Sequence, residues 1–140
     1  MDLFNYSRRE TSVVHVGNVE VGGSNPVRVQ SMTNTATQDT EACVEQAKRI
    51  IDAGADYVRL TTQGVKEAEN LRNINAELRK QGYLNPLVAD VHFTPKVADV
   101  AALYAEKVRI NPGNYLDAPR TFKQVDYTDE EYAVELQKIR

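Results

Sequence analysis

The sequence has almost no cysteine, no tryptophan and no long apolar run. Its one cysteine, Cys43, cannot form an internal disulfide or a metal site of the paired-cysteine type. No apolar stretch approaches the roughly 18 residues that suggest a membrane-spanning helix. The polar segment 1–10 also lacks the apolar core of a secretory signal. We therefore expect a cytoplasmic protein that does not bind membranes.

An excess of charge of one sign is also missing. The net charge is −3, and the lysines and arginines form no basic run. This balance argues against a nucleic-acid surface or an anionic-membrane surface as the main role. The hydrophobic share of 41% and the charged share of 26% are ordinary for a globular protein, and 140 residues suffice for one domain with a hydrophobic core.

Strand and helix patterns alternate along most of the chain. Residues 13–23 predict a β-hairpin that turns at residues 17–18. Four strands are then predicted, over residues 26–32, 57–61, 86–91 and 107–111. Apolar residues at spacings of three and four predict helices that begin near residues 40, 65 and 95. A capping box, Thr128 to Glu131, predicts a short last helix after a loop over residues 117–126.

This alternation predicts βαβ units and a parallel sheet. No Gly-x-Gly-x-x-Gly follows any strand, which counts against a dinucleotide-binding fold. We predict an α/β fold, the N-terminal half of a TIM (β/α)8 barrel preceded by a β-hairpin, because a complete barrel needs about 250 residues. The expected single partial domain has a hairpin cap at 1–24, four strand–helix units at 25–114, and a loop and terminal helix at 115–140.

Polar residues interrupt the predicted strands at a spacing of two. In the second strand Arg59 and Thr61 share one face, because side chains alternate along a strand. The other strands carry similarly spaced polar residues: Arg28, Gln30 and Asn34 in and after the first, Asp90 and His92 in and after the third, and Arg109 and Asn111 in the fourth. The apolar neighbours of these residues must contact the helices. The polar residues then point into the barrel interior near its carboxyl end, where barrels hold their active sites.

Two inward arginines, Arg59 and Arg109, favour an anionic ligand. Burying them without counter-charges costs on the order of several kcal/mol per ion. One aspartate, Asp90, cannot neutralise both, whereas a diphosphate can, and guanidinium groups bind phosphate oxygens in a bidentate way. The alternative is that both arginines form structural ion pairs with Asp90 or with glutamates. His92 fits either a structural hydrogen bond or proton transfer.

Four motifs in order carry a resemblance to a known family. Residues 29–35, 53–59, 87–93 and 108–114 resemble the 4-hydroxy-3-methylbut-2-enyl diphosphate synthases of the non-mevalonate isoprenoid pathway. The similarity covers nearly the whole chain from about Arg8. Residues 59–64 and 125–132 resemble the longer, three-domain form of this family, which occurs in some bacteria and in plastids.

The resemblance implies an oxidoreductase that reductively opens 2-C-methyl-D-erythritol 2,4-cyclodiphosphate. Two electrons would pass through a 4Fe-4S cluster, supplied by ferredoxin or flavodoxin. The resemblance assigns substrate contacts near the ring, and hence a catalytic role, to Asp90 and His92. It gives phosphate binding to Arg59 and Arg109, and a hydrogen bond to Asn111. Gln30 and Asn34 are further substrate-binding candidates from the residue pattern.

The chain departs from the family pattern at the cluster. The family's cluster ligands are three cysteines and a glutamate near the C-terminus, and this chain has only Cys43. We therefore expect these residues to bind no metal, the isolated chain to be inactive, and its open sheet edges to make it a homo-oligomer. Two alternatives stay open, a pterin-binding barrel of the dihydropteroate synthase type and a non-enzymatic phosphate-binding module.

Overall fold

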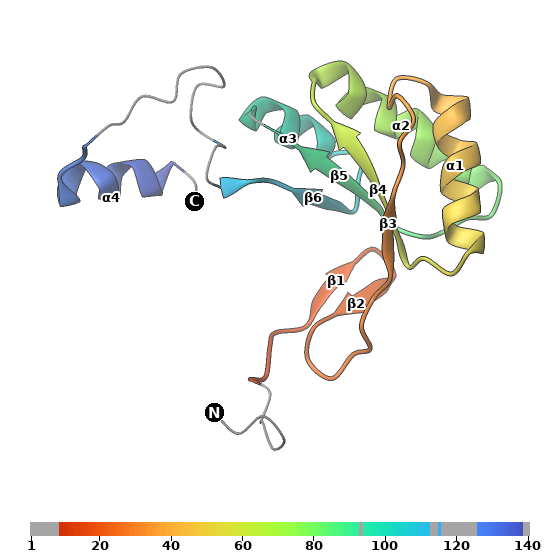
Figure 1. Ribbon diagram of the computed structural model, residues 1–140, viewed down its shortest axis with the longest axis horizontal. Coiled ribbons are helices and arrows are strands. Elements are labelled where there is room, and N and C mark those ends of the chain that lie inside the picture. Colours follow the sequence, from red (N-terminus) through yellow and green to blue (C-terminus); the bar gives the residue numbers. More distant parts are fainter. Residues whose placement is uncertain (1–8, 93, 113–114, 116–125, 139–140) are drawn as a thin grey trace.

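The computed structural model describes residues 9–92, 94–112, 115 and 126–138 (Figure 1). A two-stranded antiparallel hairpin precedes a four-stranded parallel sheet in the order β3-β4-β5-β6. The strands are β1 Val14–Val16, β2 Val19–Val21, β3 Gln30–Met32, β4 Tyr57–Thr62, β5 Leu87–Val91 and β6 Lys107–Arg109. The helices are α1 Thr40–Asp52, α2 Val65–Lys80, α3 Pro95–Ala101 and α4 Asp129–Gln137. Each sheet strand therefore pairs with the next one in the chain, as in a (β/α)8 barrel.

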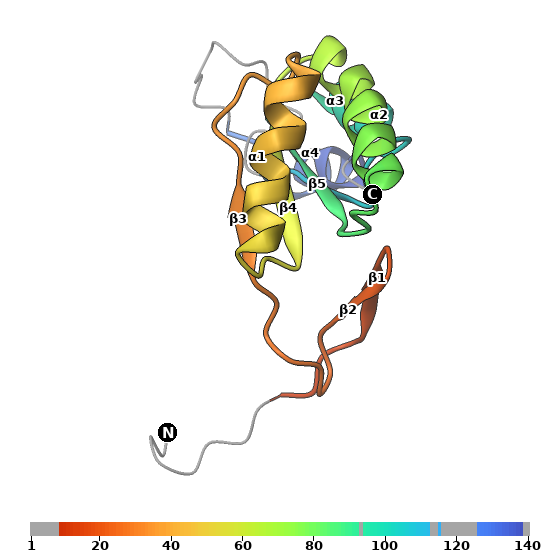
Figure 2. The same cartoon turned by 90° about the vertical axis from the view of Figure 1, so that its right-hand side faces the viewer.

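One face of the sheet is covered by helices. Helices α1, α2 and α3 all contact it, and Figure 2 shows them gathered on one side. The covered side chains of β4 and β5 are at most 1% exposed, and they are Val58, Leu60, Leu87, Ala89 and Val91. Because strand side chains alternate, residues Arg59 and Asp90 lie on the opposite face. The predicted division of the strands into an apolar outer face and a polar inner face is confirmed.

The hairpin covers the amino end of the inner face. Val16, which is 5% exposed, forms a small core with Tyr57 at the start of β4 and with Val88 of β5. A Cβ added at the hairpin turn, Gly17, would lie 3.2 Å from side-chain atoms of both Pro86 and Glu106, the residues before β5 and β6. The predicted cap therefore closes the end from which the strands start and leaves their carboxyl ends open.

Some element bounds differ from the predicted ones. β3 begins only at Gln30, because Pro26 cannot donate to a ladder and no strand pairs with the outer edge of β3 among the described residues. β6 ends at Arg109, just before the Asn111–Pro112 turn. Gly54 and Gly82 follow α1 and α2 and adopt left-handed conformations, with φ of 99° and 87°.

The last helix, α4, begins with the predicted capping box. Thr128 Oγ1 accepts a hydrogen bond from the Glu131 N–H at 3.3 Å, and the Thr128 N–H donates to Glu131 Oε2 at 2.9 Å.

Most of the predicted loop over residues 117–126 lies outside the described residues, as do part of the turn after β6 and Ile139. Among the residues that are described, no helix combines the length and the apolar character needed to cross a membrane.

Candidate active site on the inner face of the sheet

Three charged side chains from neighbouring strands meet on the inner face. Asp90 of β5 is only 1% exposed and is the register partner of Arg109 on β6. Arg109 Nη1 donates to Asp90 Oδ1 at 3.1 Å. Arg59 Nη2 of β4 donates to the other oxygen, Asp90 Oδ2. Arg59 is level with Val88, two residues before Asp90, so its long side chain extends toward the carboxyl end to make this contact.

The cluster of Arg59, Asp90 and Arg109 has an excess of positive charge. Two guanidinium groups share one carboxylate, so the three groups carry a formal charge of +1. The Arg59 Nε atom is buried and has no hydrogen-bond partner among the described residues. The side chain of Arg109 is 41% exposed, so part of it is open to solvent. The ion pairs that the sequence left as an alternative are therefore present, and they still leave donors unused.

His92 lies next to this cluster, and Asn111 lies beyond the end of β6. The His92 Nε2 atom is 3.9 Å from Asp90 Oδ2, and its side chain is 29% exposed. Asn111 is exposed and follows Arg109 by two residues, beyond the carboxyl end of β6. The structure thus brings together Arg59, Asp90, His92 and Arg109, with Asn111 at the open end.

Gln30 and Asn34 lie at different levels of the sheet. Gln30 is the register partner of Tyr57 and lines a cavity beside the hairpin, two residues before the level of Arg59. Asn34 follows β3 and lines a cavity at the carboxyl end. Its Oδ1 accepts a hydrogen bond from Gln46 Nε2 at 2.7 Å. Asn34 is therefore at the same end as the charged cluster, whereas Gln30 faces the capped end.

The cavity at the carboxyl end has a volume of about 630 Å³. It lies between the β3–α1 loop and the start of α2. Thr37 holds this loop in place, because its hydroxyl donates to the Thr61 carbonyl at 2.6 Å and its own carbonyl accepts from Asn70 Nδ2 at 2.8 Å. Gln63 and Glu67 also line the cavity, although the spacing of polar residues along the strands does not identify them. Their position after the carboxyl end of β4 is the signal that could have found them.

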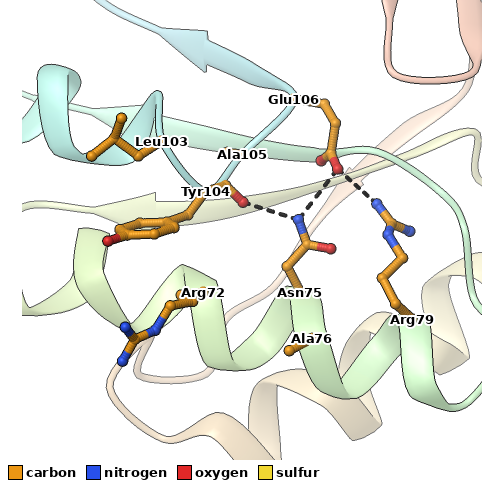
Figure 3. Close-up of a pocket in the computed structure, with 8 residues that line it drawn as sticks. All are labelled: Arg72, Asn75, Ala76, Arg79, Leu103, Tyr104, Ala105 and Glu106. Atoms are coloured by element: carbon orange, nitrogen blue, oxygen red, sulfur yellow. Dashed lines mark hydrogen bonds and ion pairs between the residues drawn. The ribbon is translucent and has the colours of Figure 1, made fainter.

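A second cavity, of about 430 Å³, lies on the outer side between α2 and residues 103–106 (Figure 3). Glu106 Oε1 accepts from Arg79 Nη2 at 2.8 Å and from Asn75 Nδ2 at 3.2 Å, and Glu106 Oε2 accepts from the Leu87 N–H at 2.8 Å. Burial alone would raise the pKa of the Glu106 carboxyl, but these hydrogen bonds outweigh it and lower the pKa. This network connects α2 to the starts of β5 and β6, so we interpret it as structural.

The described residues contain no cluster of His, Cys, Asp and Glu that could hold a metal ion. Cys43 is fully buried on α1, with its Sγ 3.1 Å from Thr35 Oγ1 and 3.3 Å from the Ala36 carbonyl oxygen. Burial raises the pKa of the Cys43 thiol, which disfavours the thiolate that iron requires. A 4Fe-4S cluster therefore does not fit the residues present.

Comparison with known proteins agrees with the fold and with the resemblance. The family model described as the GcpE TIM-barrel domain matches residues 11–136. A protein of Bacteroides fragilis (strain YCH46), named 4-hydroxy-3-methylbut-2-en-1-yl diphosphate synthase (flavodoxin), is 79% identical over 140 residues. Proteins of the same name from Bacteroides thetaiotaomicron and Protochlamydia amoebophila are 78% and 50% identical over 139 and 132 residues.

These alignments cover 100%, 99% and 94% of this chain but only 22%, 23% and 20% of the three relatives. The chain thus spans about a fifth of the length of the curated relatives that it matches. The matched family model covers the whole hairpin and all four strands of the parallel sheet. The chain belongs to the GcpE TIM-barrel domain family.

Proposed function

We propose that this chain forms the substrate-binding part of a 4-hydroxy-3-methylbut-2-en-1-yl diphosphate synthase. The whole enzyme would reductively open 2-C-methyl-D-erythritol 2,4-cyclodiphosphate in isoprenoid biosynthesis. The main support for this proposal is that Arg59 and Arg109 both donate hydrogen bonds to Asp90. These residues lie on the inner face of the sheet, which the hairpin caps at its amino end. The names of the relatives, at up to 79% identity, support it.

The two arginines would bind the diphosphate. Their formal excess of one positive charge attracts an anion, and the unused Arg59 Nε is a further donor for a phosphate oxygen. Asp90 would hold both guanidinium groups in place before the ligand arrives, so that less ordering is needed on binding. The side chains of Asn111 and Asn34, at the open end, would add hydrogen bonds, and a contact from Gln30 stays a prediction.

Asp90 and His92 would contact the substrate near its ring. The Asp90 carboxylate can accept a hydrogen bond from a hydroxyl group, and the His92 imidazole is a side chain that can transfer a proton to or from a substrate. The distance of 3.9 Å between His92 Nε2 and Asp90 Oδ2 places both groups in one small volume. They are the residues that we assign to catalysis.

The redox centre would come from residues outside this chain. A 4Fe-4S cluster, when bound by a cysteine-bearing domain, would supply two electrons to the substrate held by the barrel. The word flavodoxin in the names of the relatives supports flavodoxin as the donor, with ferredoxin as the alternative. A cytoplasmic location, a homo-oligomeric state and the division of the chain after residues 24 and 114 are further parts of this proposal.

A chimera tests the proposed function. This chain would replace the matching residues of the Bacteroides fragilis relative, to which it is 79% identical, so that a whole barrel and the rest of that protein are present. We expect the chimera, with reduced flavodoxin, to convert the cyclodiphosphate to 4-hydroxy-3-methylbut-2-enyl diphosphate. Asp90→Ala should lower kcat at least about a hundredfold, whereas Asp99→Ala, on the exposed surface of α3, should not change it.

Other outcomes would point to the alternatives. Binding of a pterin diphosphate but not of the cyclodiphosphate would support a pterin-binding barrel. Binding of phosphate compounds without any turnover would support a non-enzymatic phosphate-binding module. Either result would refute the synthase proposal.

A further inference from the structure

We propose that the cavity at the carboxyl end of β3 and β4 is a subsite that binds the hydroxyl groups of the ligand, separate from the arginines that bind its phosphates. This inference rests on the proposed function, because it assigns a second part of the same ligand to a second part of the same site. The residues that define the hydroxyl subsite are Thr33, Thr61, Gln63 and Glu67.

The hydroxyl subsite has the size and the unused hydrogen-bonding capacity of a binding site. Its volume of about 630 Å³ lies within the usual range of small-molecule pockets, which is about 300–1,000 Å³. Within the described residues, the side chains of Thr61 and Gln63 make no hydrogen bond. Thr33 is 4% exposed, and its buried Oγ1 has no partner among those residues either. Buried polar atoms rarely lack a partner, so a ligand that supplies one is a physical reason for this arrangement.

The charge of the lining favours a neutral, hydroxyl-bearing group over a phosphate. All the lining side chains except one are uncharged, and the exception, Glu67, is an anion. Glu67 Oε1 accepts a hydrogen bond from Gln38 Nε2 at 2.7 Å, which fixes the carboxylate at the wall. A carboxylate repels phosphate and accepts hydrogen bonds from hydroxyl groups, while threonine hydroxyls and the glutamine amide can both donate and accept.

The hydroxyl subsite adjoins the charged cluster through Thr61. In the parallel register of β4 and β5, Thr61 is the partner of Asp90, the carboxylate that binds both arginines. Thr61 also belongs to the inner face, because Thr62 on the other face is fully buried against the helices. A ligand whose phosphates bind Arg59 and Arg109 would then extend its carbon atoms toward Thr61.

Calorimetric titration of the chimera with two ligands tests the proposal. One ligand is the cyclodiphosphate, and the other is inorganic pyrophosphate, which has no carbon-bound hydroxyl. Thr61→Val removes the hydroxyl with little change in shape, so we expect the Kd of the cyclodiphosphate to rise about five- to tenfold and that of pyrophosphate to change less than about twofold. Gln63→Leu, at an exposed position, should give the same pattern. Thr62→Val, the neighbouring residue on the opposite face, is the matched control and should leave both affinities unchanged.

The outcomes separate this inference from the proposed function. If the unmodified chimera binds both ligands and neither Thr61→Val nor Gln63→Leu changes the ratio of their affinities, the hydroxyl subsite is wrong and the synthase proposal stands. Equal weakening of both ligands would also overturn it, because Thr61 would then act only through Asp90. If the unmodified chimera fails to bind the cyclodiphosphate, both proposals are wrong.

Discussion

Asp90 and Arg109 are register partners on adjacent parallel strands, and Arg109 Nη1 donates to Asp90 Oδ1 at 3.1 Å. The second oxygen of the same carboxylate accepts from Arg59. One buried anion thus holds two cations on a surface that faces the open end of the half-barrel. This arrangement keeps the arginines in place and leaves a net positive charge for a ligand. We would make each of the following substitutions in the chimera with the Bacteroides fragilis relative.

Replacing the Asp90 carboxylate should make the thermal stability of the protein depend on an added anion. We expect Asp90→Asn to lower stability by about 2 kcal/mol, because the two guanidinium groups lose their counter-charge. Inorganic pyrophosphate should then raise Tm more in the variant than in the unmodified chimera, because the anion takes the place of the carboxylate. Thermal unfolding with and without pyrophosphate measures this, with the exposed Asp99→Asn as the control. An equal rise in Tm with pyrophosphate in the variant and in the unmodified chimera would contradict the prediction.

The hairpin cap should contribute to stability and not to binding. Val16→Ala removes contacts with Tyr57 and Val88, so we expect a loss of about 1–2 kcal/mol and a lower Tm. Val14, on the same strand, is 55% exposed, and Val14→Ala should change Tm very little. The Kd for pyrophosphate should be the same in both variants. A weaker Kd in Val16→Ala alone would show that the cap also shapes the site.

The Glu106 network should stabilise the protein in a pH-dependent way. The pKa of this carboxyl is lowered in the folded state, so its contribution is present above the unfolded pKa of about 4.3 and is lost as the pH falls through the folded value. Glu106→Gln should therefore lower Tm clearly at pH 7 and much less near pH 4. The exposed Glu69→Gln on α2 serves as the control at both pH values. If Glu106→Gln lowers Tm equally at both pH values, the Glu106 carboxylate does not stabilise the protein in a pH-dependent way.

Cys43 should take no part in cluster binding. The side chain is fully buried, and burial raises the pKa of its thiol, so it should be neither a ligand nor a reactive nucleophile. We expect Cys43→Ala to leave the iron content of the chimera unchanged, as measured by metal analysis. In the unmodified chimera, mass mapping should find Cys43 alkylated only after unfolding. Loss of iron in the variant with its fold intact would contradict this account.

The sequence predicts the fold well where patterns are strong. The alternation of Val58, Arg59, Leu60 and Thr61 identifies the two faces of β4, and the structure confirms this division. The short strands β3 and β6 are overpredicted, because both lie at sheet edges, where pairing and not composition decides the length. At the site, spacing alone groups Arg59 with Thr61 and Asp90 with His92. The spacing does not show that Asp90 accepts hydrogen bonds from both arginines, because that depends on the register between the strands.

Some site residues could not be found from the strand pattern. Thr33 and Glu67 come together only because the β3–α1 loop folds back over the start of α2, held by hydrogen bonds from Thr37 and Asn70. These contacts join residues more than 20 positions apart, so local periodicity carries no information about them. The opposite case is Gln30, which has the spacing of a site residue but lies at the level of Tyr57, near the cap.

Calorimetric titration of the chimera with the cyclodiphosphate tests whether the two arginines bind the ligand, when the unmodified protein is compared with Arg59→Gln and Arg109→Gln. We predict a saturable single-site isotherm for the unmodified protein. Each substitution should weaken binding at least about tenfold, because one charge-assisted contact to the diphosphate is lost. Unchanged affinity in both variants, with their fold intact, would show that these arginines serve only as structural partners of Asp90 and do not bind the diphosphate.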